Sequence, residues 1–258
     1  MSEIFSGMNK IALVTGATSG IGEATALLLA KNNFDVIITG RRNERLNQLS
    51  ARLKAMQVRN LPLQFDIRQK NEVSNAMLQL PPEWRQIDLL VNNAGLAAGL
   101  EPLHENLISD WEQMIDTNIK GLLYITKIVA TGMVERRSGQ IINVSSIAGK
   151  EAYGKGAVYC ATKHAVEALT KAMRIDFNPY GIKVGSVSPG AVETEFSIVR
   201  LKDANANQKV YAGYTPLKAD DIADAILYMA TRPAHVNIAD IFVLPTAQAN
   251  ATVFHKKH

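Results

Sequence analysis

The sequence contains a single cysteine and few aromatic residues. Cys160 is the one thiol among 258 residues, so no disulfide can form within the chain, and we expect a reducing compartment such as the cytoplasm. Aromatic residues make up only 6% of the chain, and its basic residues are dispersed. Although the formal net charge is +4, this pattern fits solvated helices and small anionic ligands better than a nucleic-acid partner.

Membrane-spanning and metal-binding patterns are also missing. No apolar run approaches the roughly 20 residues needed to cross a bilayer, and the polar residues 1–9, which include Glu3, do not have the pattern of a signal peptide. The five histidines show no zinc-like spacing, and one cysteine cannot build a thiolate cluster. We therefore expect no membrane partner and no bound metal.

Strand-like and helix-like patterns alternate along the whole chain, which predicts an α/β protein. Apolar residues make up 47% of the sequence, enough for a substantial core, and there is no internal repeat or low-complexity linker. We predict a single domain over residues 1–258 with a Rossmann-like, three-layer, doubly wound parallel sheet. Its strands, about seven, are expected to begin near Lys10, Phe34, Leu61, Ile87, Gly139, Ile182 and Ala239.

A glycine-rich turn follows the first expected strand. The apolar residues 10–15 lead into the spacing Gly-x-x-x-Gly-x-Gly, and residues 23–31 after it have a helical pattern. Glycines permit a tight turn and close approach of the backbone to a pyrophosphate, while the helix start offers free N–H groups and a positive dipole. The turn therefore predicts a dinucleotide site, with candidate contacts Gly16, Thr18, Ser19, Gly20, Ile21 and Gly22.

Two arginines follow the second expected strand, where an NAD site usually has an acidic residue. Residues 35–39 lead into Gly40, Arg41 and Arg42, and no carboxylate stands at the end of the strand. Because guanidinium groups match the geometry of a phosphate, we predict that the cofactor is NADP rather than NAD. A plainer interpretation, in which the arginines only solvate the start of a helix, stays open.

Tyr159 and Lys163 stand four residues apart, and Ser146 precedes the tyrosine by thirteen residues. On a helix, positions i and i+4 lie on one face. A lysine ammonium in that place stabilises a phenolate and lowers the pKa of the tyrosine, so that the phenol can act as a general acid or base. The serine can bind the same substrate oxygen. This set suits the oxidation of an alcohol, although the Tyr–Lys spacing by itself is common.

Further motifs lie in order along the chain. They are Asp66 and Ile67 after the third expected strand, residues 92–95 (Asn-Asn-Ala-Gly) after the fourth, Asn118 in a helical stretch, and Pro189 with Gly190 after the sixth. With the glycine turn and the Ser-Tyr-Lys set, they make the chain resemble the classical short-chain dehydrogenase/reductase family over nearly its whole length. The resemblance implies NADP-dependent oxidation or reduction and an oligomer. We expect a homotetramer, assembled through the long helices that contain Asn118 and Tyr159 and through the C-terminal segment.

The resemblance also assigns roles to individual residues, with residues 10–190 as the cofactor and catalytic core. Tyr159 would exchange a proton with the substrate, and Lys163 would lower its pKa and hold the nicotinamide ribose. Ser146 would orient the substrate oxygen, and Asn118 would hold a water in a proton relay that ends at Lys163. Beyond the glycine turn and the arginines, the cofactor contacts would be Asp66 (at the adenine amino group), Ile67, Asn93, Ala94, Gly95, Tyr159, Lys163, Pro189, Gly190, Val192 and Thr194.

A narrower resemblance links the chain to the NADP-dependent 3-hydroxy acid dehydrogenases. It implies oxidation of L-serine, L-allo-threonine or 3-hydroxyisobutyrate at the 3-hydroxyl, or reduction of the corresponding semialdehyde or ketone. Two alternatives stay open, a carbonyl reductase for a 3-oxoacyl thioester or a sugar-like ketone, and more distantly a protein that only senses NADP. The matching segments are residues 39–42, 111–118, 132–136, 193–197, 199–200 and 233–238.

The family places a lid over the substrate at residues 191–214. A carboxylate substrate needs a cationic partner, best met by a guanidinium that binds both oxygens. Arg200 is the predicted partner in this lid, with Lys150 and Lys155 as second choices, and an ordinary surface arginine is the open alternative. In the segment from residue 240 to 258 we expect a last strand and then a tail.

Overall fold

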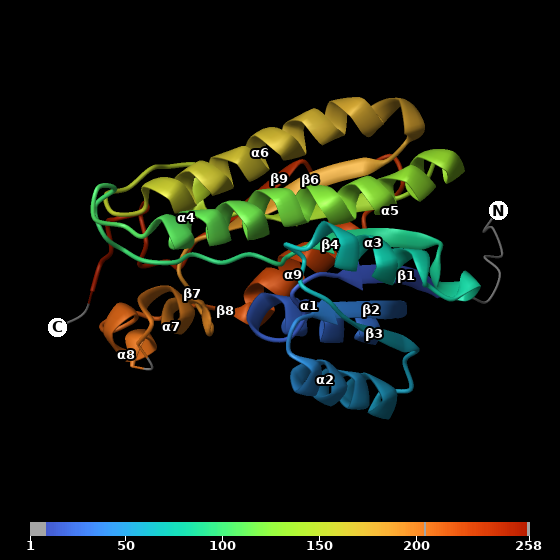
Figure 1. Ribbon diagram of the computed structural model, residues 1–258, viewed down its shortest axis with the longest axis horizontal. Coiled ribbons are helices and arrows are strands. Elements are labelled where there is room, and N and C mark those ends of the chain that lie inside the picture. The colour runs from blue at the N-terminus through green and yellow to red at the C-terminus, as the bar shows by residue number, and fades with distance from the viewer. Residues whose placement is uncertain (1–8, 204, 257–258) are drawn as a thin grey trace.

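The main sheet of the protein is parallel throughout and has seven strands. A computed structural model describes residues 9–203 and 205–256. The strands lie in the order β3-β2-β1-β4-β5-β6-β9, and every neighbouring pair is parallel. Their bounds are β1 Lys10–Val14, β2 Phe34–Gly40, β3 Asn60–Gln64, β4 Ile87–Asn92, β5 Gln140–Val144, β6 Lys183–Pro189 and β9 Asp240–Val243 (Figure 1). The predicted fold class is confirmed, and each strand begins within one residue of its expected place.

The central strands are almost continuously apolar because helices cover both faces of the sheet. In β1, Val14 packs into one core and its neighbour Leu13 into the other, since successive side chains point to opposite faces. Each of these side chains is fully buried. Alternation of apolar and polar residues, which would mark a sheet with one wet face, is therefore missing from the sequence of β1.

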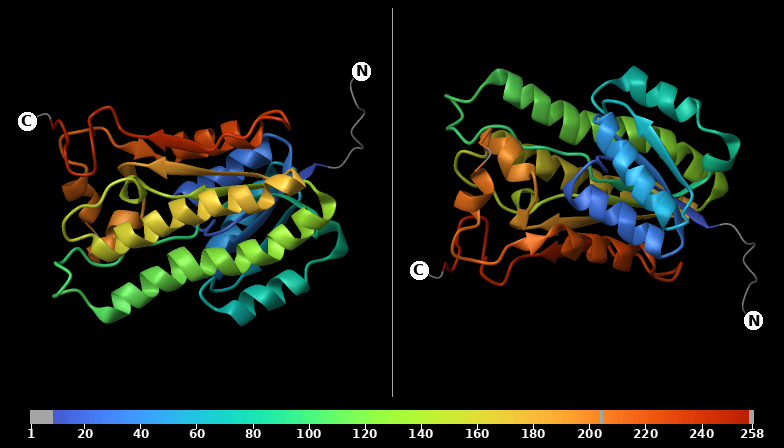
Figure 2. Two further views of the ribbon diagram at one scale, coloured as in Figure 1. Left: turned by 90° about the horizontal axis from the view of Figure 1, so that it is seen from above. Right: turned by 90° about the horizontal axis from the view of Figure 1, so that it is seen from below.

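Helices form one layer on each side of the sheet (Figure 2). The first layer consists of α1 (Gly20–Lys31), α2 (Asn43–Ala55) and α9 (Ala219–Ala230), which bury side chains in the same core as Val14. The second consists of α3 (Lys70–Leu78), α5 (Leu122–Arg136) and α6 (Ala157–Phe177), which share the core of Leu13. Helix α4 (Ile108–Ile115) continues into α5 through a π-helical turn at Asp116–Gly121. Short 3₁₀ turns lie at Pro82–Trp84, Ile147–Gly149 and Asn178–Tyr180.

The segment predicted to be a lid has regular structure that its sequence did not indicate. It contains α7 (Phe196–Leu201) and α8 (Ala206–Val210), and a two-stranded sheet joins β7 (Val192–Glu193) to β8 (Leu217–Lys218). These elements lie at one end of the molecule, beside the carboxyl ends of the main strands (Figure 1). Such short elements show no periodicity, which is why sequence patterns missed them. No helix within the described residues is both long and apolar enough to cross a bilayer.

Candidate active site

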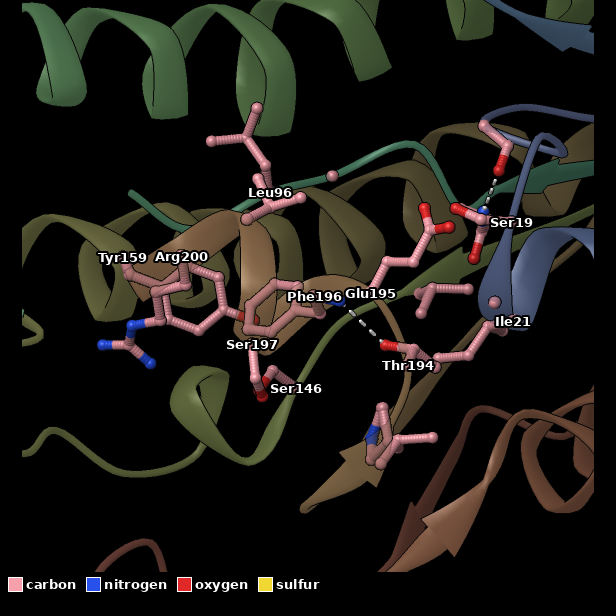
Figure 3. A pocket seen from close by; sticks show the side chains of 18 of the residues that line it. Ser19, Ile21, Leu96, Ser146, Tyr159, Thr194, Glu195, Phe196, Ser197 and Arg200 are labelled. Carbon is pink, nitrogen blue, oxygen red and sulfur yellow. Dashed lines mark hydrogen bonds between the residues drawn. The ribbon is translucent and has the colours of Figure 1, made fainter. Parts of the chain in front are cut away.

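A cavity of about 730 Å³ lies where the main strands end, with the lid on one side of it (Figure 3). The strand order reverses at β1, since β2 and β4 lie on opposite sides of it, and open parallel sheets bind ligands at such a switch point. Every residue predicted to contact the cofactor lines this cavity except Gly22. Ser146 and Arg200 line it as well, whereas Asn118 lies behind its wall.

The glycine turn is held tightly against the end of β4. Gly16 has φ +66°, and a Cβ atom there would lie 2.9 Å from the Cα of Ala94. The side-chain amide of Asn93 donates to the backbone oxygens of Thr15 at 2.8 Å and Gly16 at 3.2 Å. A Cβ atom at Gly22 would collide with that amide and with the Gly16 carbonyl, so this glycine serves packing. The arrangement leaves the start of α1 facing the cavity, as a pyrophosphate requires.

Arg42 lies over the glycine turn. Its Nη2 donates to the Thr18 carbonyl at 3.1 Å and to the Ser19 hydroxyl at 2.8 Å, while its Nη1 donates to Glu195 of the lid at 2.8 Å. Arg45, in the first turn of α2, donates to the other oxygen of Glu195 at 3.2 Å. The hydrogen bond from Arg42 is the main reason that the pKa of Glu195 is lowered. No pattern in the sequence places Glu195 at the arginines, which lie about 150 residues away in the chain.

Asp66 lines the adenosine side of the cavity, but its carboxylate already forms an ion pair with an arginine. Arg68 donates to it from Nε at 3.0 Å and from Nη2 at 2.6 Å, and Nη1 of Arg41 lies 3.8 Å away. Burial acts to raise the pKa of Asp66, yet the hydrogen bonds and charge of Arg68 outweigh it and hold that pKa below its usual value. The predicted contact with an adenine amino group therefore has to share the carboxylate with Arg68.

Ser146, Tyr159 and Lys163 come together at the other end of the cavity. The hydroxyl of Ser146 accepts from the backbone N–H of Ala148 at 3.1 Å. It lies near enough to Tyr159 to act on the phenol and lower its pKa. Lys163, one turn beyond Tyr159 on α6, donates to the carbonyl of Val144 at 2.9 Å. Its Nζ lies 6.0 Å from the centre of the tyrosine ring. This geometry holds the phenol oxygen and the serine oxygen close enough to bind one substrate atom.

The acid–base properties of the pair differ from the sequence expectation. Burial raises the pKa of Tyr159 above its ordinary value, and the opposing effects of Ser146 and Arg200 are smaller. Burial also lowers the pKa of Lys163 to about 8, against the opposing charge of Glu167. Desolvation therefore outweighs the stabilisation of a phenolate by lysine, because both groups are buried.

Asn118 lies in the π-helical turn between α4 and α5. Its side-chain oxygen accepts from the N–H of Leu96 at 2.9 Å, and its amide donates to the Leu96 carbonyl at 2.8 Å and to Thr162 at 3.0 Å. These bonds tie it to the segment after β4 and to α6. A Cβ atom at Gly95 would lie 3.3 Å from this oxygen and 3.4 Å from the Nζ of Lys163. The side chain of Asn118 therefore lies near Lys163, but both its oxygen and its nitrogen already form hydrogen bonds within the protein.

Arg200 lies beside Tyr159 in the cavity (Figure 3). Its guanidinium carbon is 5.5 Å from the centre of the Tyr159 ring and 5.5 Å from that of Tyr153. Nη1 donates to the Tyr153 hydroxyl at 2.9 Å, and Nε to the Gly99 carbonyl at 3.3 Å. Nη2 is buried and has no hydrogen-bond partner among the residues that the structure describes. A buried donor without a partner is costly, so an anionic ligand at this place would be held strongly.

The second-choice cations do not lie at the same place. Lys150 donates to Glu167 and to Asp240, both at 2.8 Å, and does not line the cavity. Lys155 does not line the cavity either; it lines a small hollow that it shares with Arg200. Lys150 is thus wrong as a candidate, because two carboxylates from α6 and β9 already neutralise it.

The C-terminal segment contributes to the cavity, whereas from the sequence we expected a last strand, a tail and a part in an interface between subunits. Gln248, Ala251, Phe254 and Lys256 line it. The Phe254 ring lies 5.0 Å from that of Tyr214 at the end of the lid. Residues 257 and 258 lie outside the described part of the chain. A basic tail carries no periodic signal, so only the fold could place it here. Within the described residues, no group of three or more histidine, cysteine or acidic side chains could hold a metal ion.

Residues 10–205 match the family described as short chain dehydrogenase. The chain belongs to this family. It is 46% identical over 243 residues to an NADP-dependent 3-hydroxy acid dehydrogenase of Salmonella typhi, which covers 93% of this chain and 97% of the relative. It is also 42% identical to sulfoacetaldehyde reductase 2 of Chromohalobacter salexigens, over 94% of this chain and 96% of that protein.

Solved structures of the family agree with the fold. The closed form of a serine dehydrogenase complexed with NADP+ superimposes with a TM-score of 0.90 at 42% identity, covering 96% of this chain and all of that one. The serine dehydrogenase of Escherichia coli gives a TM-score of 0.81 at 40% identity, covering 93% of this chain and 99% of the other. The predicted family is thereby confirmed, whereas the roles of individual residues stay predictions.

Proposed function

We propose that this short-chain dehydrogenase is an NADP-dependent oxidoreductase that oxidises 3-hydroxy acids, such as L-serine, at the 3-hydroxyl, or reduces the corresponding semialdehyde. The observation that carries the proposal is the buried guanidinium of Arg200. It lies 5.5 Å from the centre of the Tyr159 ring, and its Nη2 has no partner within the described part of the chain. It puts a carboxylate-binding group beside the acid–base residue, the arrangement that a short hydroxy acid needs. The relatives named for 3-hydroxy acids and for serine support the same substrate class.

The residues around the glycine turn fit NADP. The turn leaves no space for side chains at Gly16, and the start of α1 faces the cavity, which suits a pyrophosphate. Arg41 and Arg42 supply positive charge for a phosphate on the adenosine ribose, and Lys163 lies within reach of the nicotinamide side. When bound, NADP accepts the hydride from the substrate carbon or returns it.

The chain's own residues orient the substrate and move a proton. Arg200 binds the carboxylate and thereby fixes the distance between that group and the 3-hydroxyl. Ser146 donates to the hydroxyl oxygen, and the Tyr159 phenolate removes its proton during oxidation. In reduction the phenol returns the proton to the carbonyl oxygen. Lys163 favours the phenolate through its charge, and Asn118 holds the segment after β4 in place beside it.

A different anionic aldehyde is the alternative substrate. A guanidinium binds a sulfonate as well as a carboxylate, and one relative is named sulfoacetaldehyde reductase 2. A 3-oxoacyl thioester or a sugar-like ketone has no such anion beside the reacting carbon and fits Arg200 less well.

The deciding experiment compares substrates in wild type and Arg200→Gln. NADPH formation is followed with L-serine, L-allo-threonine, 3-hydroxyisobutyrate and a secondary alcohol without a carboxylate, and sulfoacetaldehyde is tested in reduction. We expect the hydroxy acids to react, the alcohol to fail, and the variant to raise KM for L-serine about tenfold to a hundredfold. Turnover of the plain alcohol together with an unchanged KM for serine would contradict the proposal. Better use of NAD than of NADP would contradict the cofactor assignment.

We further propose a cytoplasmic homotetramer. The single cysteine is buried, which suits a reducing compartment. Helix α6 exposes Ala168, Ala172 and Ile175, the last with 74% of its surface accessible, and α5 exposes Leu123. These small and apolar side chains support helix packing between subunits, as expected of the helices that contain Asn118 and Tyr159.

A further inference from the structure

Glu195 connects two parts of the molecule that are far apart in the chain. It lies at the start of α7 in the lid, while Arg42 and Arg45 lie at the start of α2. One carboxylate oxygen accepts from Arg42 at 2.8 Å, and the other accepts from Arg45 at 3.2 Å. The carboxylate points along the cavity toward Ser19 (Figure 3), which also helps to lower the pKa of Glu195. Arg42 also donates to the hydroxyl oxygens of Thr18 and Ser19, so two guanidinium groups and two hydroxyls gather around this carboxylate.

The guanidinium and hydroxyl groups around Glu195 form a site suited to a phosphate monoester. Two guanidinium groups and a serine hydroxyl beside a glycine turn are the groups that bind such an anion with several hydrogen bonds. The side chains of Arg42 and Arg45 are 45% and 46% exposed, and that of Glu195 is 36% exposed. A ligand can therefore reach the arginines from the cavity or from solvent without unfolding the lid.

A ribose 2′-phosphate should bind these arginines more strongly than the Glu195 carboxylate does. It carries about −1.5 to −2 charge at neutral pH and three acceptor oxygens, whereas the Glu195 carboxylate has one charge and two oxygens. The two anions cannot occupy the same guanidinium edges together, because the second would face a like charge at close range. Binding of one therefore excludes the other.

We propose that Glu195 is a built-in competitor for the 2′-phosphate, which it keeps off Arg42 and Arg45 until NADP displaces it. This inference rests on the proposed assignment of Arg42 to the NADP phosphate and extends that assignment to Arg45, which shares Glu195 with it. A cofactor or fragment without a 2′-phosphate leaves the carboxylate in place. Only a ligand with that phosphate has to break both ion pairs, and by doing so it frees the lid from α2. Glu195 therefore determines how much the 2′-phosphate contributes to the affinity for the cofactor.

The test uses two adenosine fragments, so that the nicotinamide end plays no part. Isothermal titration calorimetry gives the Kd of adenosine 2′,5′-bisphosphate and of adenosine 5′-monophosphate for wild type, Glu195→Gln and Glu193→Gln. Glu193 is the matched control, an exposed carboxylate two residues earlier, for which no ion pair is formed among the described residues. It reports the general effect of removing one negative charge near the lid.

We expect Glu195→Gln to bind the bisphosphate about threefold to tenfold more tightly, as loss of two partly exposed ion pairs predicts, with the monophosphate unchanged. Glu193→Gln should leave both Kd values unchanged. Equal tightening for both fragments, weaker binding of the bisphosphate, or the same effect from Glu193→Gln would overturn the inference. If wild type itself shows no preference for the bisphosphate, the arginine assignment fails as well, which separates that failure from the others.

Discussion

At the scale of single residues, the cavity contains a tyrosine and a lysine whose proton affinities are set mainly by burial. Tyr159 and Lys163 both lie almost out of contact with solvent. Burial disfavours the charged form of each, so the phenol holds its proton to higher pH and the lysine loses its proton at lower pH. The positive charge of Arg200 and the hydroxyl of Ser146 partly offset this for the tyrosine.

The pH dependence should follow the tyrosine. Oxidation needs the phenolate, and the pKa of Tyr159 is raised, so kcat/KM for L-serine should increase as pH rises into the alkaline range, while kcat/KM for reduction should fall. Arg200→Gln removes a charge that lowers this pKa and should move the rising limb to higher pH. Lys202→Gln, which removes a lid charge paired with Asp110, should leave the limb in place. A limb that Arg200→Gln does not move would show that the guanidinium does not act on Tyr159.

Removal of the phenol hydroxyl should stop the chemistry and spare the cofactor site. Tyr159→Phe keeps the ring that packs 5.7 Å from Phe196 and loses only the proton-transferring oxygen. We expect kcat to fall by about a hundredfold to ten-thousandfold. NADPH affinity, measured by fluorescence titration, should change less than about twofold, because the hydroxyl is directed at the substrate. Retained turnover would refute the role of Tyr159.

At the scale of secondary-structure elements, the functional side chains depend on where strands stop and helices begin. The turn between β1 and α1 packs against the residues that follow β4. Within this turn, Gly16 has φ +66°. That conformation disfavours any residue with a side chain. The lid elements β7 and α7 follow β6 directly and carry Glu195 and Arg200 to opposite ends of the cavity.

Gly16→Ala should therefore lower both stability and cofactor affinity. The alanine would have a strained backbone conformation, and its Cβ atom would lie 2.9 Å from the Cα of Ala94. We expect about 1–3 kcal/mol less stability in urea unfolding and weaker NADPH binding. Gly154→Ala is the matched control, because a Cβ atom there meets nothing within 4 Å. Equal behaviour of the two variants would show that the turn tolerates a side chain.

At the scale of the whole molecule, the outer surface of α5 and α6 is the region most suited to assembly. It carries exposed Ala168, Ala172 and Ile175 on α6 and Leu123 on α5, over the face of the sheet that holds the core of Leu13. Small residues allow helices from two subunits to approach closely. Helix α6 carries Tyr159 and Lys163, and Asn118 lies in the turn directly before α5, so packing between subunits would also brace the active site.

Ala168→Arg should reduce the mass of the assembly. A large cation in a close helix contact would leave an unpaired charge at the interface. We expect light scattering to give a tetramer for wild type and a dimer or monomer for the variant. Ala51→Arg, the same change at an exposed alanine of α2 on the other side of the sheet, should leave the mass unchanged. A monomeric wild type would contradict the proposed tetramer.

The sequence by itself determined the fold class, the strand positions and the family. Continuous apolar strands, the turn of Gly16, Gly20 and Gly22, and the motifs at strand ends are local patterns, and local patterns can be read without knowing the fold. They also pointed to the cavity's residues, since strand ends of a parallel sheet meet at one edge. The fold class and the residues that line the cavity could therefore be predicted from residue types and their spacing, without knowledge of tertiary contacts.

Only the tertiary structure decided which charges meet and which proton affinities result. Glu195 faces Arg42 because the lid folds back over α2, and Lys150 is unavailable because Glu167 and Asp240 bind it. The raised pKa of Tyr159 comes from burial by surrounding segments, which no spacing of residues reveals. Electrostatic energies depend on distances and on exclusion of water, and both are set by how remote parts of the chain pack together.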